Sequence, residues 1–444
     1  DVLRMGDEVA DKEPDLFAHL QEKIGEDDIA TIIYTSGSTG TPKGVEITHK
    51  NLVSQTKAAA QRFPLIPGED KILTCLPLAH IFERMVIYYY ISTGCSIYFA
   101  DDIKNVGDLL REINPTIITM VPRLLEKVHA KMLKNVDNST GIKKKIGRAA
   151  FDAAIKHSPQ KKPGGIKGYV FNRLVYSKLR AAMGNKLRLV IIGGAPLGRD
   201  MGRFFINAGI PLFEGYGLTE ASPVICANFE DNRKVGTVGM PFPGVEVKIA
   251  EDGEILVRGP NIMRGYHNNE KATSQAIDED GWLHTGDSGV FDDDGYLKIT
   301  GRIKELFKTS SGKYVSPIPI ENAIKKHKFI DMCCVVAEAR NFVTCLIFPD
   351  FENLKEYKEF CGYEYLEDKD FFISDFIIQE MNALLHSVNR NLNSWERVQK
   401  FRIIEKPVSV ETGELTPTMK IVRHVIEKKF KPLIDEMYSE RKYE

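Results

Sequence analysis

Short apolar runs alternate with segments of helical periodicity through the first half of this chain, from residue 29 to residue 213. The apolar runs have the length and the flanking residues of buried strands. Strands separated by helices form βαβ units, which assemble into a largely parallel sheet. The expected strands are 29–34, 71–76, 95–99, 116–120, 187–192 and 210–213, and the expected helices are 52–62, 106–113, 122–133 and 199–208.

The pattern changes after residue 236. Short strands with Gly, Asp and Pro turns fill residues 236–300, and Asp252-Gly253 and Asp294-Gly295 are strong hairpin signals. Beyond Arg302 a new mixed pattern predicts a separate small α+β domain over 303–444. The predicted class is therefore α/β, with a large domain (1–302) of mainly parallel sheets flanked by helices plus a β-rich subdomain, and then the small C-terminal domain.

Composition narrows the class of protein. The 444 residues are 43% hydrophobic and 27% charged, which is typical of a globular protein with more than one core. Lys+Arg 60 and Asp+Glu 61 nearly cancel, so the net charge indicates neither nucleic acid nor an anionic membrane as a partner. The seven scattered cysteines lack a C-x-x-C pair, which disfavours a disulfide framework or a zinc site and favours a reducing, cytoplasmic setting.

Two segments bear on membranes. The most apolar window, residues 85–100, is shorter than the ~20 residues that a bilayer span needs. Lysine and arginine gather between residues 131 and 188, with Lys143-Lys144-Lys145 as one dense group and Pro163-Gly164-Gly165 as a predicted surface loop. A solvated helical insertion is the favoured interpretation of this basic stretch, and peripheral docking on a membrane surface stays open as an alternative.

A phosphate-binding loop is predicted at residues 34–44, which read Tyr-Thr-Ser-Gly-Ser-Thr-Gly-Thr-Pro-Lys-Gly. Its glycines let backbone N–H groups approach an anion, its hydroxyls add donors, and Lys43 balances the charge. It is not a Walker A loop, because Pro42 precedes Lys43 and Gly44 follows it, which leaves no Ser or Thr beside the lysine for magnesium. The candidate phosphate ligands are Thr35, Ser36, Gly37, Ser38, Thr39, Gly40 and Lys43.

A second glycine-rich segment, residues 213–220, follows an expected strand. Glycines on both sides of Tyr216 allow a tight backbone path, so the ring can lie against a flat ligand such as adenine. Glu220 is an oxygen donor suited to Mg²⁺, which binds through one or two carboxylates plus phosphates. The candidate nucleotide ligands here are Glu214, Gly215, Tyr216, Gly217 and Thr219.

Two charged side chains near the predicted domain boundary are candidate ribose ligands. Asp287 is expected just past a tight turn in the segment 281–287, and its carboxylate can accept hydrogen bonds from both ribose hydroxyls. Arg302, in the segment 300–304, offers a second ribose contact.

Together these motifs resemble, in the same order, those of the AMP-forming adenylate synthetases, the superfamily of acyl-CoA ligases, firefly luciferase and peptide-synthetase adenylation domains. The resemblance covers residues 29–437. It implies that Thr219 contacts the α-phosphate, that the turn formed by Gly194, Ala195 and Pro196 lines the adenine pocket, and that Lys304 is the hinge before a mobile C-terminal domain.

Three further segments carry the resemblance. Residues 414–420 resemble the mobile-domain loop whose lysine, here Lys420, reaches the reacting carboxylate and the α-phosphate, where an ammonium stabilises the developing charge. Residues 76–84 resemble the long-chain fatty acyl branch, in which a histidine, here His80, stands near the acyl and thiol ends of the site. The glycine-bearing loop around Gly312 resembles the one that lines the pantetheine passage.

The resemblance implies a long-chain fatty acid–CoA ligase that uses ATP, Mg²⁺ and coenzyme A, with Lys420, Thr219, Glu220 and His80 as its catalytic residues. Acyl transfer to acyl carrier protein is an alternative acceptor reaction. A different class, an inactive nucleotide or lipid binder, is also open, because family members ordinarily carry a longer segment ahead of the phosphate loop than residues 1–28. Nothing in the sequence sets the chain length of the acid or the oligomeric state.

Overall fold

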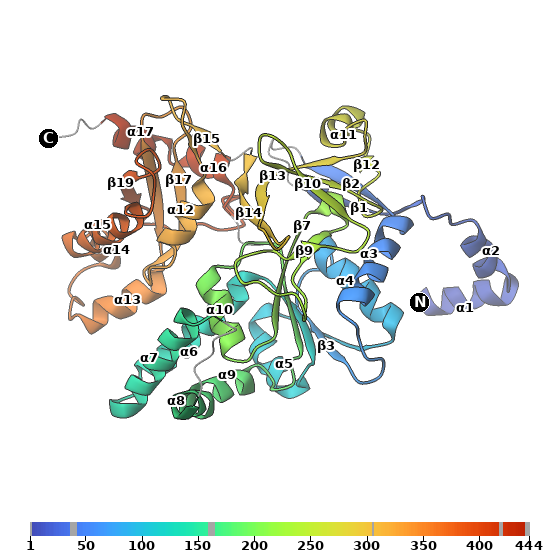
Figure 1. Ribbon diagram of the computed structural model, residues 1–444, viewed down its shortest axis with the longest axis horizontal. Helices are drawn as coiled ribbons and strands as arrows, with labels where there is room; N and C mark the ends of the chain where they lie inside the picture. Colours follow the sequence, from blue (N-terminus) through green and yellow to red (C-terminus); the bar gives the residue numbers. More distant parts are fainter. Residues whose placement is uncertain (1, 36–41, 159–164, 304–305, 417–420, 440–444) are drawn as a thin grey trace. The chain divides into compact units, whose positions relative to one another are not determined.

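The computed structural model describes residues 2–35, 42–158, 165–303, 306–416 and 421–439 (Figure 1). The chain divides into two compact units. Unit 1 comprises Asp1–Thr285 with Gly289–Ile299, and unit 2 comprises Gly286–Ser288 with Thr300–Glu444. The predicted boundary between residues 302 and 303 and the hinge at Lys304 stay predictions, and Lys304 lies outside the described residues.

Unit 1 is built on a seven-stranded sheet of order β4-β3-β5-β6-β7-β8-β9. The first five strands in this order are parallel, and β8 and β9 are antiparallel to their neighbours. The sheet is therefore mixed, with a parallel majority, as the sequence predicts. The strands are β3 (Lys71–Thr74), β4 (Ser96–Phe99), β5 (Ile117–Met120), β6 (Leu189–Ile192), β7 (Leu212–Gly217), β8 (Val224–Ala227) and β9 (Met240–Pro241).

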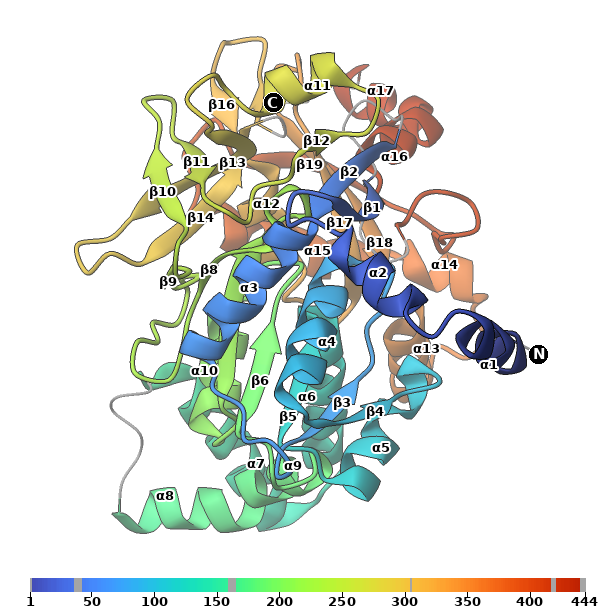
Figure 2. The same ribbon diagram turned by 90° about the vertical axis from the view of Figure 1, so that its right-hand side faces the viewer.

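Helices cover both faces of this sheet. Because successive side chains along a strand point to opposite faces, adjacent strand residues pack against different sets of helices. Ile72 and Ile117 pack into a hydrophobic cluster with α3 (His49–Arg62) and α4 (Ile81–Thr93), whereas Leu73 and Ile118 belong to a second cluster. Figure 2 shows α3 and α4 on the near face. The second cluster holds α5 (Val106–Ile113), α6 (Pro122–Asp137), α7 (Gly141–Lys156), α9 (Ser177–Ala182) and α10 (Arg199–Asn207).

Two smaller sheets hold the remaining strands of unit 1, and residues 286–288 and 300–302 of the second sheet belong to unit 2. One has the order β1-β2-β12, and in it β2 pairs antiparallel with both neighbours. The other has the order β10-β11-β13-β14, and both predicted hairpins are present, with Gly253 (φ +87°) and Gly295 (φ +80°) in the left-handed conformation that glycine adopts readily. The strands are β1 (Ile29–Thr35), β2 (Lys43–Thr48), β12 (Gly265–Tyr266), β10 (Glu246–Ile249), β11 (Glu254–Arg258), β13 (Leu283–Phe291) and β14 (Leu297–Arg302).

Unit 2 holds a three-stranded sheet of β17 (Ile330–Val336), β18 (Val343–Pro349) and β19 (Val398–Ile403). The predicted strand pair 333–337 and 344–348 is the antiparallel pair β17–β18. One face of the sheet packs on α12 (Pro317–Ile324), α13 (Phe351–Phe360), α14 (Asp368–Phe372) and α15 (Asp375–Asn389), and the other on α16 (Arg423–Lys429) and α17 (Lys431–Ser439).

Two differences from the predicted elements matter for the site. Residues 43–48 form β2, whereas the sequence predicted a strand only before the phosphate loop; the alternation Val45-Glu46-Ile47 is too short to stand out. The helix α3 then begins at a capping box, in which Thr48 Oγ1 accepts from Asn51 N at 3.2 Å and Asn51 Oδ1 accepts from Thr48 N at 2.9 Å. The strand β7 continues to Gly217, beyond the predicted end at residue 213.

Two helices at the start of the chain, α1 (Val2–Lys12) and α2 (Leu16–Glu22), contribute no buried residue. Across the described parts of the chain, we find no helix with the length and the hydrophobicity that a membrane crossing requires.

Candidate active site

The predicted phosphate loop connects β1 to β2. Thr35 pairs with Lys43 and Tyr34 pairs with Gly44 in this antiparallel ladder, and Thr35 Oγ1 donates to the backbone oxygen of Lys43 at 3.5 Å. The two ends of the loop are therefore held side by side. The predicted ligands Ser36, Gly37, Ser38, Thr39 and Gly40 lie outside the described residues and stay predictions.

Lys43 and Glu220, predicted from two separate motifs, meet at one tyrosine. The Nζ atom of Lys43 lies 4.8 Å from the centre of the Tyr266 ring. The hydroxyl of Tyr266 donates to Glu220 Oε1 at 2.9 Å. A cation, an aromatic ring and a carboxylate thus form one row, which joins the phosphate loop to the predicted magnesium ligand.

The strand pairing explains this arrangement. Tyr266 on β12 pairs with Val45 on β2, two residues beyond Lys43, so the side chains of Tyr266 and Lys43 lie on the same side of the small sheet. Burial, and then the charge and the hydrogen bond of Glu220, raise the pKa of Tyr266 well above its usual value. Tyr266 therefore stays a hydrogen-bond donor at every physiological pH. No motif in the sequence pointed to Tyr266, which reaches the site through pairing between distant segments.

Thr219 and Glu220 lie in a 3₁₀ turn, Thr219–Ala221, that directly follows β7. The backbone oxygen of Glu220 accepts from Met263 N at 2.9 Å, so both the main chain and the carboxylate are held by the segment 263–266. Among the described residues, no three His, Cys, Asp or Glu side chains converge on a common metal site. One oriented carboxylate suits Mg²⁺, because this ion takes most of its ligands from water and substrate phosphates.

Gly217 is required by a close backbone approach. A Cβ atom at this position would lie 1.9 Å from the backbone oxygen of Pro223, and one at Gly215 would lie 3.3 Å from that of Cys226. Both glycines therefore serve the pairing of β7 with β8, where the backbone of the neighbouring strand comes close. Tyr216 lies between them, paired with Cys226 and partly buried.

The turn at residues 194–196 contacts the same strand. Leu197 N, directly after Pro196, donates to Glu214 Oε1 at 3.0 Å. Gly194 adopts a φ of +79°, which allows the chain to turn at the end of β6. Burial raises the pKa of Glu214 to about 7, against the opposing effect of the Leu197 hydrogen bond. The structure therefore brings the predicted adenine-pocket turn and Glu214 together.

Asp287 and Arg302, the predicted ribose ligands, form an ion pair within unit 2. Arg302 Nε lies 2.9 Å from Asp287 Oδ1, and Asp287 is buried whereas Arg302 is exposed. Asp287 lies inside β13, so the expected position just past a tight turn was wrong. Beside the pair, Thr300 Oγ1 donates to Ser288 Oγ at 3.0 Å.

His80 is the residue just before α4, and its exposed side chain makes no capping hydrogen bond. Three residues later, Glu83 is fully buried between the ends of two strands. Thr119 Oγ1 on β5 donates to Glu83 Oε2 at 2.5 Å, and Thr74 Oγ1 on β3 donates to Glu83 Oε1. Burial raises the pKa of Glu83 to about 7, although both hydroxyls oppose this effect.

The remaining predicted residues belong to unit 2. Gly312 (φ +78°) forms the turn between β15 (Phe307–Lys308) and β16 (Tyr314–Val315). Lys420 lies outside the described residues, but the base of its loop is described. There Leu415 pairs with Ile421, and Val422 N donates to Glu414 O at 2.8 Å.

Glu414 anchors this base. It is 1% exposed and accepts hydrogen bonds from Lys429 Nζ, Thr412 Oγ1 and Ser409 N. Burial favours the neutral acid, but these donors outweigh it and lower the pKa of Glu414 to about 2. The carboxylate is therefore ionised at neutral pH.

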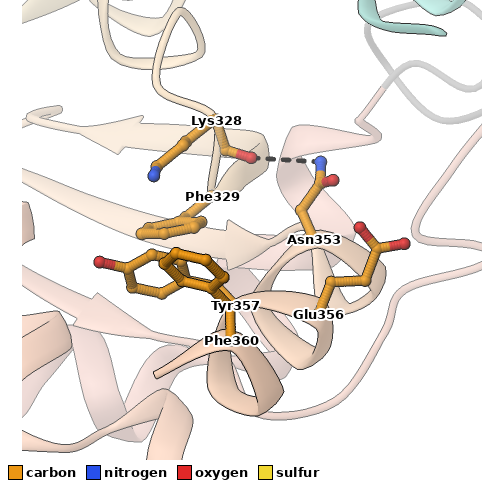
Figure 3. Close-up of a pocket in the computed structure, with 6 residues that line it drawn as sticks. All are labelled: Lys328, Phe329, Asn353, Glu356, Tyr357 and Phe360. Atoms are coloured by element: carbon orange, nitrogen blue, oxygen red, sulfur yellow. Dashed lines mark hydrogen bonds between the residues drawn. The ribbon is translucent and has the colours of Figure 1, made fainter. Parts of the chain in front are cut away.

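Unit 2 also has a shallow hollow of about 220 Å³, shown in Figure 3. Lys328 Nζ lies 4.5 Å from the ring centre of Phe329 and 4.4 Å from that of Tyr357, and Asn353 Nδ2 donates to Lys328 O at 3.3 Å. None of the predicted site residues lines this hollow, whose rim also includes Glu356 and Phe360.

The chain matches two family profiles. The profile described as AMP-binding enzyme matches residues 3–267, and that described as AMP-binding enzyme C-terminal domain matches residues 305–442. A protein named long-chain-fatty-acid–CoA ligase FadD15, from Mycobacterium bovis, is 39% identical over 426 residues, covering 93% of this chain and 70% of the relative. Long chain acyl-CoA synthetase 6, peroxisomal, from Arabidopsis thaliana is 33% identical over 437 residues, covering 93% and 61%.

Solved structures share the fold. O-succinylbenzoate coenzyme A synthetase from Bacillus subtilis, in complex with AMP, has a TM-score of 0.65 at 22% identity and covers 90% of this chain and 69% of its own. The adenylation domain of a carboxylate reductase from Mycobacterium chelonae has a TM-score of 0.72 at 21% identity, covering 94% and 61%. With profiles that match most of its length, and relatives of this identity, the chain belongs to the AMP-binding enzyme family.

Proposed function

We propose that this chain activates a long-chain fatty acid with ATP and transfers the acyl group to coenzyme A. The observation that carries the proposal is the row Lys43–Tyr266–Glu220, in which the lysine predicted to bind phosphate and the carboxylate predicted to bind magnesium contact one ring. Membership of the AMP-binding enzyme family supports ATP as the substrate. The names of the relatives from Mycobacterium bovis and Arabidopsis thaliana support a long-chain acid and coenzyme A.

In the first half-reaction, the fatty carboxylate attacks the α-phosphorus of ATP, an acyl-adenylate forms, and pyrophosphate leaves. Lys43 and the loop 35–40 bind the leaving phosphates. Glu220 would supply one ligand to Mg²⁺, which when bound would neutralise charge on the phosphates. Tyr266 orients Glu220 through its hydroxyl. Thr219 contacts the α-phosphate, and Lys420 stabilises the charge that develops as the two anions meet.

In the second half-reaction, the thiol of coenzyme A loses its proton to water and its sulfur attacks the acyl carbonyl. A carbon–sulfur bond forms, the bond between the acyl carbon and the phosphate oxygen breaks, and AMP leaves with that electron pair. Gly194, Ala195, Pro196, Glu214 and Tyr216 hold the adenine, and Asp287 and Arg302 hold the ribose. His80 stands at the acyl and thiol ends, and Gly312 lines the pantetheine passage. A rotation of the C-terminal domain about Lys304 switches the site from the first half-reaction to the second.

The two alternatives have less support. The curated relatives are named as coenzyme A ligases, so no observation favours acyl carrier protein as the acceptor. An inactive binder would not need the Lys43–Tyr266–Glu220 row, and the family is one of enzymes.

Fatty-acid-dependent exchange between ATP and pyrophosphate tests the first half-reaction. Lys420→Ala should lower the exchange rate by roughly 100- to 1,000-fold, because a group that stabilises transition-state charge is lost. Lys428→Ala, at an exposed position on α16, is the matched control and should leave the rate unchanged. An unchanged exchange rate in Lys420→Ala would show that this lysine does not stabilise the transition state. If the folded wild-type chain catalyses no exchange, the alternative of an inactive nucleotide or lipid binder is favoured.

A second variant tests the observation that carries the proposal. Tyr266→Phe keeps the ring beside Lys43 but removes the donor to Glu220. Because Glu220 loses its orienting partner, the Mg²⁺ concentration that gives half-maximal exchange should rise by about 10- to 100-fold. An unchanged magnesium requirement would separate Glu220 from metal binding.

A further inference from the structure

One end of unit 1 exposes large apolar side chains. Four of them come from α7 and from the helix that begins with α8 (Gly165–Phe171) and continues through a π-helical turn (Asn172–Tyr176) into α9. Figures 1 and 2 both show α7 and α8 at the lower end of unit 1, and the two helices contact each other. The exposed fractions are 75% for Ile142, 84% for Ile166, 64% for Tyr169 and 46% for Leu174. We name these four residues the apolar tips.

Exposed lysines directly follow two of the apolar tips in the chain. Asp152 is the one acidic residue between positions 138 and 178, a stretch with ten lysines and arginines. Lys143, Lys144 and Lys145 form the exposed first turn of α7 directly after Ile142, and Lys167 follows Ile166. In the described part of the chain, none of these four lysines forms an ion pair. The net charge of the whole chain therefore conceals a strongly basic local surface.

A surface hollow lies beside Arg173, on the helix that begins with α8. A shallow hollow of about 450 Å³ is lined by Arg173 on the π-helical turn, with Tyr169, Leu174, Asn172 and Ser177. The hollow combines one guanidinium, one amide and two hydroxyls, one of which belongs to Tyr169, with the apolar side chain of Leu174. A phosphate ester with an attached hydrocarbon chain has the complementary chemistry, because Arg pairs well with phosphate oxygens.

This composition favours a lipid surface over a protein partner. The centres of protein interfaces are depleted in lysine, whereas this surface is dominated by it. Apolar side chains that project from helices, with lysines beside them, are typical of segments that lie at the boundary between headgroups and acyl chains. Anionic lipid headgroups attract such lysines over a Debye length.

We propose that the apolar tips and the lysines beside them dock this chain on an anionic phospholipid bilayer. The lysines contact the headgroups, and Ile142 and Ile166 enter the outer part of the acyl region. The benefit to the enzyme rests on the function proposed above, since its acid substrate partitions into bilayers. The docking itself depends only on this surface.

The test is sedimentation of the full chain with vesicles, without ATP or fatty acid, so that a failure of the ligase function leaves the result readable. Vesicles of phosphatidylcholine mixed with phosphatidylserine should bind the chain, vesicles of phosphatidylcholine alone should bind it weakly, and added salt should release it. Replacing Lys143, Lys144 and Lys145 by Gln should weaken binding by about fivefold for each charge removed. Ile166→Ser should weaken it at all salt concentrations.

Two controls match these variants. Lys57→Gln removes an exposed lysine from α3, and Phe360→Ser removes the 86% exposed phenylalanine of the Figure 3 hollow. Neither should change binding. Absence of vesicle binding by the wild-type chain overturns the proposal, as does equal loss in the controls. If light scattering instead shows self-association that Ile166→Ser abolishes, without vesicle binding, the surface joins copies of the chain and the proposal is wrong.

Discussion

Replacing Glu83 by Gln should change how the stability of unit 1 depends on pH. Burial raises the pKa of this carboxyl from 4.5 to about 7. Because the folded-state pKa is the higher one, the stabilising contribution is complete below about pH 4.5 and is lost as the pH rises through about 7. Each pKa unit corresponds to about 1.36 kcal/mol, so the full contribution is about 3.4 kcal/mol. The linkage relation places about 2.5 kcal/mol of it between pH 5 and pH 8.

Glutamine keeps the shape of the side chain and stays neutral, so the variant should lack this loss. The difference in the free energy of unfolding between variant and wild type should therefore grow by about 2.5 kcal/mol in favour of the variant from pH 5 to pH 8. Two titratable groups that interact electrostatically with Glu83, Cys75 and Tyr90, have pKa values raised chiefly by burial and stay neutral over this range.

Urea unfolding followed by tryptophan fluorescence measures this difference. The chain has two tryptophans, Trp282 in unit 1 and Trp395 in unit 2, so a Trp395→Phe background reports on unit 1 alone. Glu112→Gln, at an exposed position on α5, is the matched control and should show no such pH dependence. If the difference between Glu83→Gln and wild type is the same at both pH values, the carboxyl is ionised in the folded chain and the reasoning fails.

Two other predictions concern the site. Gly217→Ala should destabilise unit 1 by roughly 3 kcal/mol or more and weaken ATP binding, because the added Cβ would lie 1.9 Å from the Pro223 backbone oxygen. The control Gly107→Ala, in open space on a helix, should be neutral or stabilising. Equal unfolding midpoints for the two variants would contradict this prediction. Glu414 has a folded pKa of about 2, below the ordinary 4.5, so its contribution is present above about pH 4.5 and lost as the pH falls toward 2. Glu414→Gln should therefore lower the stability of unit 2 at neutral pH and reduce the further loss of stability on acidification. The fluorescence of Trp395 in a Trp282→Phe background measures both effects. An unchanged midpoint of acid unfolding would contradict the lowered pKa of Glu414.

The parallel sheet could be predicted because its strands are buried on both faces. Ile117 and Ile118 are adjacent yet pack into different hydrophobic clusters, so the strand reads as one continuous apolar run. The strand β2 could not be predicted in this way, because Gly44 and Glu46 interrupt the run and its partners lie on β1 and β12. The local pattern of apolar residues indicates a strand reliably where burial determines that strand. It does not do so where the strand depends on pairing with segments that are distant in the sequence.

The candidate site shows the same division. Lys43 and Glu220 stand in short motifs whose chemistry is visible in the sequence. Tyr266 and Glu83 do not, since Tyr266 depends on pairing with Val45 and Glu83 depends on two hydroxyls from separate strands. A lone acid within the apolar run of α4 was the one available signal for Glu83. The glycines around Tyr216 were singled out for a tight backbone path, and the structure shows that the neighbour which comes close is the strand β8.

The antiparallel pairing of β1 with β2 constrains the length of the connection that is predicted to bind phosphate. Seven residues, 36–42, separate Thr35 from Lys43, and these two residues are partners in the ladder. An insertion or deletion of one residue that shifted β2 would turn Val45 and Ile47, both fully buried, toward the opposite side of the sheet, and Lys43 would turn with them. Substitutions within residues 36–42 should therefore be tolerated far more readily than insertions or deletions there.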